Sequence, residues 1–264
     1  MKRAILSLLF LFVISSCQTP EKENWIEEED FATHFAELDV DGTFVLFDQA
    51  QETYFVHDSQ RANTGFIPAS TYKIFNSLVA LETNQIADAD EVIQWDGVER
   101  GIAVWNQDHN LRSAIQNSVV WFYQELARGI GAEQMSDYLE RAEYGNQDLT
   151  GKIDSFWLDG KLRITPKEQV GFLRRLYHDD LPFSQRSMDI VKDILVFEEG
   201  EQYIMRAKTG WGQRFEPQVG WFVGYVEQND NVYFFATNID IVHPADAGKR
   251  IILTKTILRT QGLL

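Results

Sequence analysis

The sequence predicts an α+β fold, in which an antiparallel sheet flanked by terminal helices carries an inserted all-helical lobe. Two observations support this prediction. Runs of β-prone residues occur within residues 43–57 and again after residue 203, near the two ends of the chain. Between them, from roughly residue 70 to residue 190, apolar residues recur at helical spacing. A cleft between two such lobes is the expected place for a ligand site.

The early strands are predicted to form a hairpin. Thr43–Phe47 and Thr53–His57 are rich in β-branched and aromatic residues, and a short polar segment separates them. A helix should then start near Ser70, because Pro68 precedes it and apolar side chains follow at helical spacing. Those side chains are Ile74, Phe75, Leu78, Val79 and Leu81.

The middle of the chain favours helices over residues 111–142, with Gly129 and Gly131 interrupting them. Two further helices are predicted, one beginning at Thr165 and one near Ser187. These helices make up the predicted lobe.

The pattern changes to strands after Gly200. Tyr203–Lys208, Gly220–Glu227 and Val232–Asn238 are β-prone, and the turn residues 229–231 make the last two antiparallel neighbours. Ala247–Leu258 is predicted to be a closing helix.

Composition limits the classes of partner. The 264 residues are 44% hydrophobic and 13% aromatic, which is typical of a globular core. The 24 basic residues face 40 acidic ones, for a formal charge of −16. Binding to nucleic acid requires a basic surface, so this balance argues against a nucleic-acid partner.

The first residues resemble an export signal. Lys2 and Arg3 precede an apolar run that is too short to span a bilayer, and small residues then lead to Cys17. We therefore expect a signal peptide at 1–16 and lipidation at Cys17, the sole cysteine of the chain. An ordinary signal peptide, with Cys17 incidental, is the alternative. With lipidation at Cys17, we expect a protein that is exported to the periplasm and anchored to the membrane as a lipoprotein. Residues 17–30 read as an acidic tether, which leaves 31–264 as the catalytic domain.

The first chemical motif is Ser70-Thr71-Tyr72-Lys73. At the start of a helix, residues three apart share a face, so a hydroxyl and an amine lie side by side. A serine hydroxyl needs an adjacent base to act as a nucleophile, and helical N–H groups stabilise a developing oxyanion. A capping serine with a surface lysine would explain this motif alone equally well.

The second motif is Lys208-Thr209-Gly210, at the end of a predicted strand. Lysine supplies a positive charge and threonine a hydroxyl donor, and glycine would let a ligand approach the backbone closely. In this order, the two motifs form the signature shared by penicillin-recognising enzymes.

Four more segments extend the match. Ser118-Val119-Val120, Tyr144-Gly145-Asn146, Phe156-Trp157-Leu158 and Arg250 follow in the order that one family shows. With them, the chain resembles the class D serine β-lactamases, the oxacillinase type, over nearly all of its mature length. The resemblance implies hydrolysis of β-lactam antibiotics through an acyl-enzyme on Ser70.

The resemblance also implies a role for each residue. Lys73 would take up carbon dioxide as N6-carboxylysine and act as the general base, with no metal and no other cofactor. Val120, Trp157 and Leu158 would surround it, and the indole N–H of Trp157 would donate to the carbamate. Ser118 would relay a proton to the leaving nitrogen. Backbone N–H groups of Ser70 and Trp211 would hold the oxyanion. The substrate carboxylate would bind Lys208, Thr209 and Arg250, beside Gly210. The Tyr-Gly-Asn segment is interpreted as mainly structural.

The chain departs from the related classes. It has valine at position 120 where class A enzymes and peptidases have asparagine, and it has no Glu-x-x-Leu-Asn segment to activate water. A class C enzyme would place tyrosine at position 118. Two alternatives stay open at this point: a penicillin-binding D-Ala-D-Ala peptidase and a β-lactam sensor domain that stays acylated. Some enzymes of this class dimerise, so a homodimer also stays open.

Overall fold

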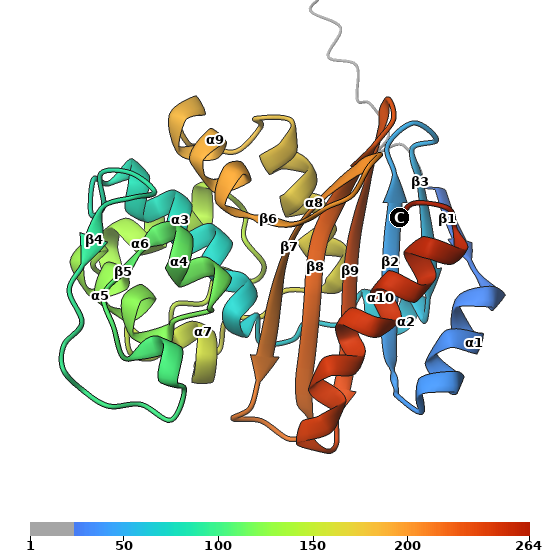
Figure 1. Ribbon diagram of the computed structural model, residues 1–264, viewed down its shortest axis with the longest axis horizontal. Coiled ribbons are helices and arrows are strands. Elements are labelled where there is room, and N and C mark those ends of the chain that lie inside the picture. Colours follow the sequence, from blue (N-terminus) through green and yellow to red (C-terminus); the bar gives the residue numbers. More distant parts are fainter. Residues whose placement is uncertain (1–23) are drawn as a thin grey trace, which may run out of the picture.

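A computed structural model describes residues 24–264 and contains a seven-stranded sheet in the order β1-β3-β2-β9-β8-β7-β6 (Figure 1). The strands are β1 (Asn24–Glu27), β2 (Gly42–Asp48), β3 (Thr53–His57), β6 (Val196–Glu199), β7 (Tyr203–Gly212), β8 (Gln218–Gln228) and β9 (Asn231–Ile241). Strand β2 pairs with β9, which joins the two ends of the chain in one sheet. The predicted hairpin of β2 with β3 and the predicted antiparallel pair of β8 with β9 are confirmed. The pairing of β1 with β3 is parallel, so the sheet is mixed at that edge.

Helices cover both faces of this sheet. Helix α1 (Glu29–Leu38) and helix α10 (Lys249–Thr260), which follows the 3-10 turn η3 (Pro244–Gly248), cover one face. The helical lobe lies against the other face (Figure 1). The lobe and its connections comprise α2 (Ser59–Ala62), η1 (Ala69–Tyr72), α3 (Lys73–Glu82), β4 (Val92–Ile93), η2 (Ala103–Trp105), β5 (His109–Asn110), α4 (Leu111–Gln116), α5 (Val120–Ile130), α6 (Ala132–Arg141), α7 (Phe156–Asp159), α8 (Pro166–Tyr177) and α9 (Gln185–Ile194).

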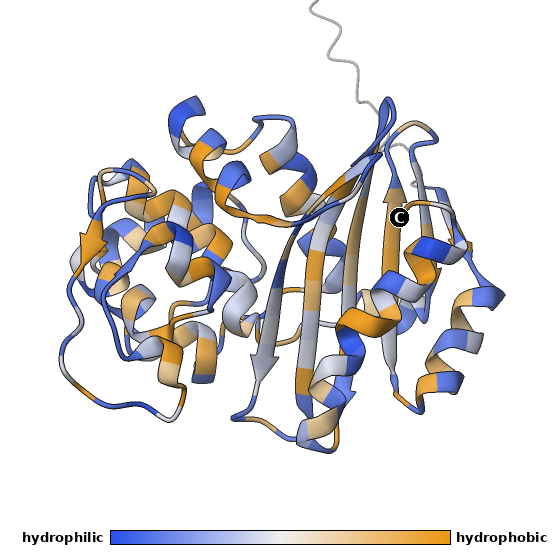
Figure 2. Cartoon of the chain, in the orientation of Figure 1, coloured by the Kyte–Doolittle hydropathy of each residue, from blue (hydrophilic) through white to orange (hydrophobic). Residues whose placement is uncertain are grey.

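Two apolar cores hold these layers together. Phe31 and Phe35 of α1 pack with Leu253 and Ile257 of α10 against one face of the sheet. The larger core fills the lobe and its contact with the other face, and helix α3 runs through it with every residue from Lys73 to Leu81 buried. Figure 2 shows hydrophobic residues in the strands and in the helices on both sides of them. A lysine at the start of such a helix is unusual, because burial of a charged side chain is costly.

Three local predictions need correction. The helix at Ser70 begins as the 3-10 turn η1 and becomes α-helical only at Lys73. Gly129 lies inside α5, and only Gly131, with a φ of +79°, separates α5 from α6. Residues 24–30 are not tether, because β1 pairs with β3 and α1 begins at Glu29.

The signal peptide 1–16, Cys17 and the tether up to residue 23 lie outside the described residues. Within residues 24–264, no helix has the length and hydrophobicity that crossing a bilayer requires.

Candidate active site

Ser70 lies on a sharp turn at the sheet-facing end of the lobe. The turn begins after Pro68, and Ala69 adopts a φ of +48°, a left-handed conformation that costs energy for a residue with a side chain. Lys73 begins α3 directly after the turn, and its Nζ lies 3.0 Å from Ser70 Oγ. The predicted side-by-side placement of hydroxyl and amine is therefore present.

Lys73 is fully buried. Its Nζ donates to Ser118 Oγ at 2.8 Å and to the carbonyl oxygen of Ser118 at 2.6 Å, and it lies 5.5 Å from the ring centre of Tyr123. Within residues 24–264 no carboxylate forms an ion pair with it. Burial, and then the nearby charge of Lys208, hold the pKa of Lys73 well below its usual value. The amine is thus biased towards its neutral, nucleophilic form.

Ser118 connects the lobe to the sheet. It precedes α5 with a φ of +53°, and its Oγ also accepts a hydrogen bond at 3.1 Å from Lys208 of β7. Lys208 is buried as well, and burial followed by the charge of Arg250 lowers its pKa to about 7. One hydroxyl therefore lies between two buried amines, a geometry suited to passing a proton.

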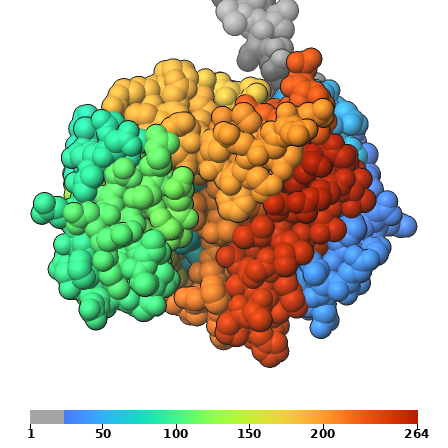
Figure 3. All heavy atoms as spheres, in the orientation of Figure 1, coloured from blue at the N-terminus to red at the C-terminus, as the bar shows by residue number. Residues whose placement is uncertain are grey.

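A cleft of about 400 Å³ opens above these groups. Its walls come from the turn, the segment around residue 102, α5, α7, the end of β7 and α10, and include Ser70, Ser118, Val120, Leu158, Thr209, Gly210, Trp211 and Arg250. Figure 3 shows the surface hollowed between the green part of the lobe and the orange strands.

The cleft attracts anions although the whole chain is acidic. Arg250, near the start of α10, bonds to the carbonyl oxygen of Ala247, while its Nε is buried without a partner among residues 24–264. Burial lowers the pKa of Arg250 to about 10. Arg250 and Lys208 lack carboxylate partners in the described part of the chain, so a ligand with an acidic group would gain from both of them.

Comparisons with known proteins agree with this geometry. Residues 42–259 match the family model described as the penicillin binding protein transpeptidase domain. Beta-lactamase OXA-48 of Klebsiella pneumoniae is 44% identical over 262 residues, which span 98% of this chain and 99% of the relative. The crystal structure of the class D β-lactamase YbXI from Nostoc has a TM-score of 0.87 at 48% identity, covering 89% of this chain and 99% of that one. The chain belongs to the class D β-lactamases.

A second structure of the class, FUS-1 (OXA-85) from Fusobacterium nucleatum, has a TM-score of 0.88 at 36% identity and covers 90% of this chain and 100% of that one. The predicted family and fold are thus confirmed. A class D β-lactamase is a serine hydrolase that works through a serine acyl-enzyme, and this sets aside the peptidase and the sensor domain.

In this class D enzyme, Trp157 lies behind the cleft rather than in its wall. The residue is fully buried on α7, and its ring stacks on Tyr72, the neighbour of Lys73, with centroids 5.2 Å apart and an interplanar angle of 21°. Its Nε1 has no hydrogen-bond partner among residues 24–264. A buried N–H without an acceptor costs free energy, which points to an acceptor that the protein side chains do not supply.

Gly210 lines the cleft and has a second, structural neighbour. A Cβ there would lie 3.1 Å from the carbonyl oxygen of Pro68 and 3.1 Å from Thr71 Cγ2. The missing side chain therefore lets β7 approach the turn that carries Ser70, and the close approach of a ligand to this backbone stays a prediction. Trp211 lines the cleft, and its indole donates to Gln218 at 2.9 Å.

The Tyr144-Gly145-Asn146 segment lies outside the cleft. Tyr144 is buried against Phe75 and Phe172, with ring centroids 4.9 Å and 5.0 Å away. Gly145 has a φ of +54°, and a Cβ there would collide with the carbonyl oxygen of Arg163. The structural interpretation of this segment agrees with these contacts.

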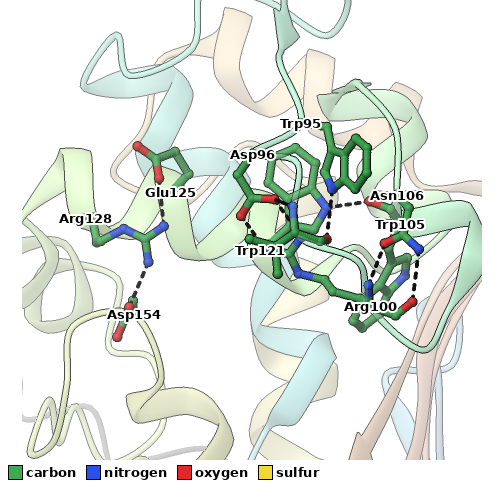
Figure 4. Close-up of polar contacts among 10 residues, drawn as sticks. Trp95, Asp96, Arg100, Trp105, Asn106, Trp121, Glu125, Arg128 and Asp154 are labelled. Carbon is green, nitrogen blue, oxygen red and sulfur yellow. Dashed lines mark hydrogen bonds and ion pairs between the residues drawn. The ribbon is translucent and has the colours of Figure 1, made fainter.

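Sequence reasoning missed the walls that loops contribute. Ile102 and Trp105 line one side, and Gln213 and Arg214 line another. The indole of Trp105 donates to the carbonyl oxygen of Asn117 at 2.9 Å. Trp121 donates to the carbonyl oxygen of Trp105 at 2.8 Å, within the polar network that Figure 4 draws. The side chain of Ile102 is hydrophobic and exposed, which is a feature of binding surfaces, but its exposure is known only from the structure.

An ion pair connects two of these walls. Arg214, in the loop after β7, pairs with Asp159 at the end of α7. Both side chains are partly exposed, so the pair contributes little stability, but it links the two sides of the cleft mouth.

Proposed function

We propose that Ser70 is the nucleophile of this class D β-lactamase and that Lys73, carboxylated by dissolved carbon dioxide, is its general base. The observation that carries the proposal is the fully buried Lys73 amine, 3.0 Å from Ser70 Oγ and without a carboxylate partner in the described chain. Among residues 24–264, no carboxylate lines the cleft to take the role of base in its place.

The surroundings of Lys73 fit a carboxyl group on its amine. Only a neutral amine attacks carbon dioxide, and burial favours that form although the ordinary pKa is about 10.4. In the reaction an N–C bond forms and one proton leaves, so the side chain changes from neutral to anionic. The unpartnered Trp157 indole would donate to this group, and the Ser118 hydroxyl, which accepts from Lys208, lies 2.8 Å from the amine. The group, when bound, supplies an anionic base of moderate strength.

Each of the remaining residues then has a role in one step of the reaction. Ser70 Oγ loses its proton and attacks the lactam carbonyl, the lactam C–N bond breaks, and Ser118 passes a proton to the leaving nitrogen. A water molecule then attacks the Ser70 ester, which releases the ring-opened acid and restores the hydroxyl. Backbone N–H groups of Ser70 and Trp211 stabilise the oxyanion, a contribution of about 10²–10³ in rate per donor in serine hydrolases. Lys208, Thr209 and Arg250 bind the substrate carboxylate.

The pH dependence tests the carboxylated base. A lower pH converts the Lys73 amine to its ammonium form and protonates the carbamate, so activity should fall with acid, and added bicarbonate should restore it at constant pH. The measurement is kcat for a penicillin across a bicarbonate series below pH 7, in buffers freed of carbon dioxide. A loss of activity at low pH that is unchanged at every bicarbonate concentration would overturn the proposal.

We also propose that the enzyme is exported and anchored by a lipid at Cys17, on the support of Lys2, Arg3 and the apolar run before this cysteine. Mass spectrometry of protein from a bacterial host should find a mature chain that starts at a diacylated Cys17, and Cys17→Ser should release the protein from the membrane fraction. A mature chain that begins elsewhere contradicts the lipid anchor.

A further inference from the structure

The turn that carries Ser70 is supported from the sheet and from the lobe. On the sheet side, Gly210 of β7 packs directly on Pro68 and Thr71, and the Trp221 indole of β8 donates to the carbonyl oxygen of Ile67 at 2.9 Å. The turn needs such support because Ala69 holds a left-handed φ that its side chain disfavours.

On the lobe side, the support is polar and fully buried. Gln169 of α8 donates through Nε2 to Thr71 Oγ1 at 2.8 Å, and Thr71 Oγ1 donates to the carbonyl oxygen of Pro68 at 2.8 Å. These hydrogen bonds form a continuous chain from α8 to the residue two positions before the nucleophile. Gln169 and Thr71 are both buried, so water does not compete with these bonds.

The Tyr144-Gly145-Asn146 segment holds in place the residues that support the Ser70 turn. Asn146 accepts from the backbone N–H of Arg163 at 2.8 Å and donates to the carbonyl oxygen of Lys161 at 2.9 Å. The next residue, Ile164, exchanges two backbone hydrogen bonds with Phe66, at 2.9 Å and 3.0 Å. Thr165 then caps α8, the helix that carries Gln169. The segment thereby holds both the approach to the turn and the helix that braces it.

We propose that Gln169 is a positioning residue for acylation, which acts on Ser70 through the Thr71 hydroxyl. Its burial supports a role beyond packing. Gln169 Oε1 is buried without a partner that meets hydrogen-bond geometry among residues 24–264, and the Tyr144 hydroxyl lies beside Thr71 and Gln169. An unsatisfied buried acceptor destabilises a protein, so an apolar side chain would suit the fold better here. A polar residue is useful at this position because it orients the turn.

The consequence concerns geometry at the reacting atom. Without the Gln169 bond, the Thr71 hydroxyl loses the donor that orients it towards the Pro68 carbonyl, which then keeps only the backbone N–H of Thr71 at 3.1 Å as a firmly held donor, and Ala69 can relax towards ordinary backbone angles. Ser70 Oγ then shifts relative to Lys73 Nζ and the oxyanion donors. Displacement of a reacting group by about 1 Å costs roughly 10²-fold in rate, and a partial displacement should cost about tenfold.

The test is a double-mutant cycle on Gln169→Leu and Thr71→Val, with the acylation rate constant measured by stopped flow on a chromogenic cephalosporin. Each single variant should acylate about tenfold more slowly per active site, and the double variant should be no slower than either, because both changes break one chain of bonds. Thr71→Ser, which keeps the hydroxyl, should acylate at close to the wild-type rate. Effects that multiply to about a hundredfold, or a Gln169→Leu variant that acylates at the wild-type rate, would overturn the inference.

Ser187→Ala is the matched control. Ser187 is buried in the same lobe and donates to Glu82 at 2.8 Å, away from the turn. Its loss should lower Tm without changing the acylation rate. If Gln169→Leu does not fold, the comparison of Thr71→Val with Thr71→Ser decides alone, and equal rates refute the inference.

This inference rests on the proposed role of Ser70, and the two failures are distinguishable. Peptide mass mapping of the wild-type acyl-enzyme should find the label on Ser70. A label elsewhere refutes the proposed function, whereas a label on Ser70 with normal acylation by Gln169→Leu and Thr71→Val refutes only the positioning role.

Discussion

Replacement of Lys73 by alanine is expected to lower kcat for a penicillin by at least about 10³-fold. A general base contributes about 10²–10⁴ to one step, and Lys73 is the only buried amine within hydrogen-bond distance of Ser70 Oγ in residues 24–264. The same base serves acylation and hydrolysis of the ester. Both steps should therefore slow, and any acyl-enzyme that forms should persist.

Intact-mass spectrometry after mixing with penicillin separates these effects. Lys73→Ala should acquire the acyl mass slowly and hold it for hours, while the wild-type enzyme clears it within seconds. Lys152→Ala is the matched control, because Lys152 is exposed and lies outside the cleft lining. Its kcat should be unchanged. Turnover by Lys73→Ala within tenfold of wild type would show that another group is the base.

The Lys73→Ala variant should also keep its thermal stability. Lys73 is a buried amine in an apolar helix, and alanine removes the cost of that burial. A Tm at or above the wild-type value would show that the loss of activity is chemical, since the variant is then fully folded at the assay temperature.

The parts of the fold that local pattern determines were predictable. The β2–β3 hairpin and the β8–β9 pair follow from β-prone runs separated by turn residues, and the cap at Thr165 marks the start of α8. Strands β1 and β6 were missed, because each has four residues and depends on a neighbouring strand for its conformation.

At Gly210, the sequence predicted the residue but only one of its two neighbours. Met205 and Ala207 of β7 face the core under α1 and α10, so alternation points Lys208 and Gly210 towards the lobe. The sequence shows that alternate side chains of β7 point to opposite faces of the sheet, but it does not show which element packs on each face. Only the structure shows that η1 packs where a Gly210 side chain would lie.

The residues at the mouth of the cleft could not be predicted from the sequence for the same reason. Ile102, Trp105 and Arg214 come from segments without a repeating pattern, and their approach to Ser70 depends on how the lobe sits on the sheet. The net charge of the chain also did not predict the local charge of the cleft. A chain with a formal charge of −16 still places the basic side chains of Lys208 and Arg250 beside one cleft, because the local field depends on which charges the fold brings together there.

Trp157→Phe isolates the indole N–H from the rest of the site. Phenylalanine keeps an aromatic ring beside Tyr72 and removes the indole N–H, a buried donor that has no partner in the described chain. A hydrogen bond to a charged group is worth about 1.5–3 kcal/mol, so the carboxylation equilibrium of Lys73 should weaken by about 10- to 150-fold. At ambient carbon dioxide, kcat should fall by a similar factor, because only the carboxylated fraction of the enzyme has its base.

Two measurements on this variant distinguish carboxylation from packing. Carbon-13 NMR with labelled bicarbonate should show the carbamate signal in the wild-type enzyme and little of it in Trp157→Phe. Saturating bicarbonate should then restore much of the lost kcat, which repair of a packing defect would not require. Trp25→Phe, a change in the edge strand β1, is the control and should alter neither quantity. Because the indole is argued to bind the carboxyl group itself, an undiminished carbamate signal together with wild-type kcat in Trp157→Phe would remove the reason for the unpaired N–H, and the role of Lys73 would then need another stabilising donor.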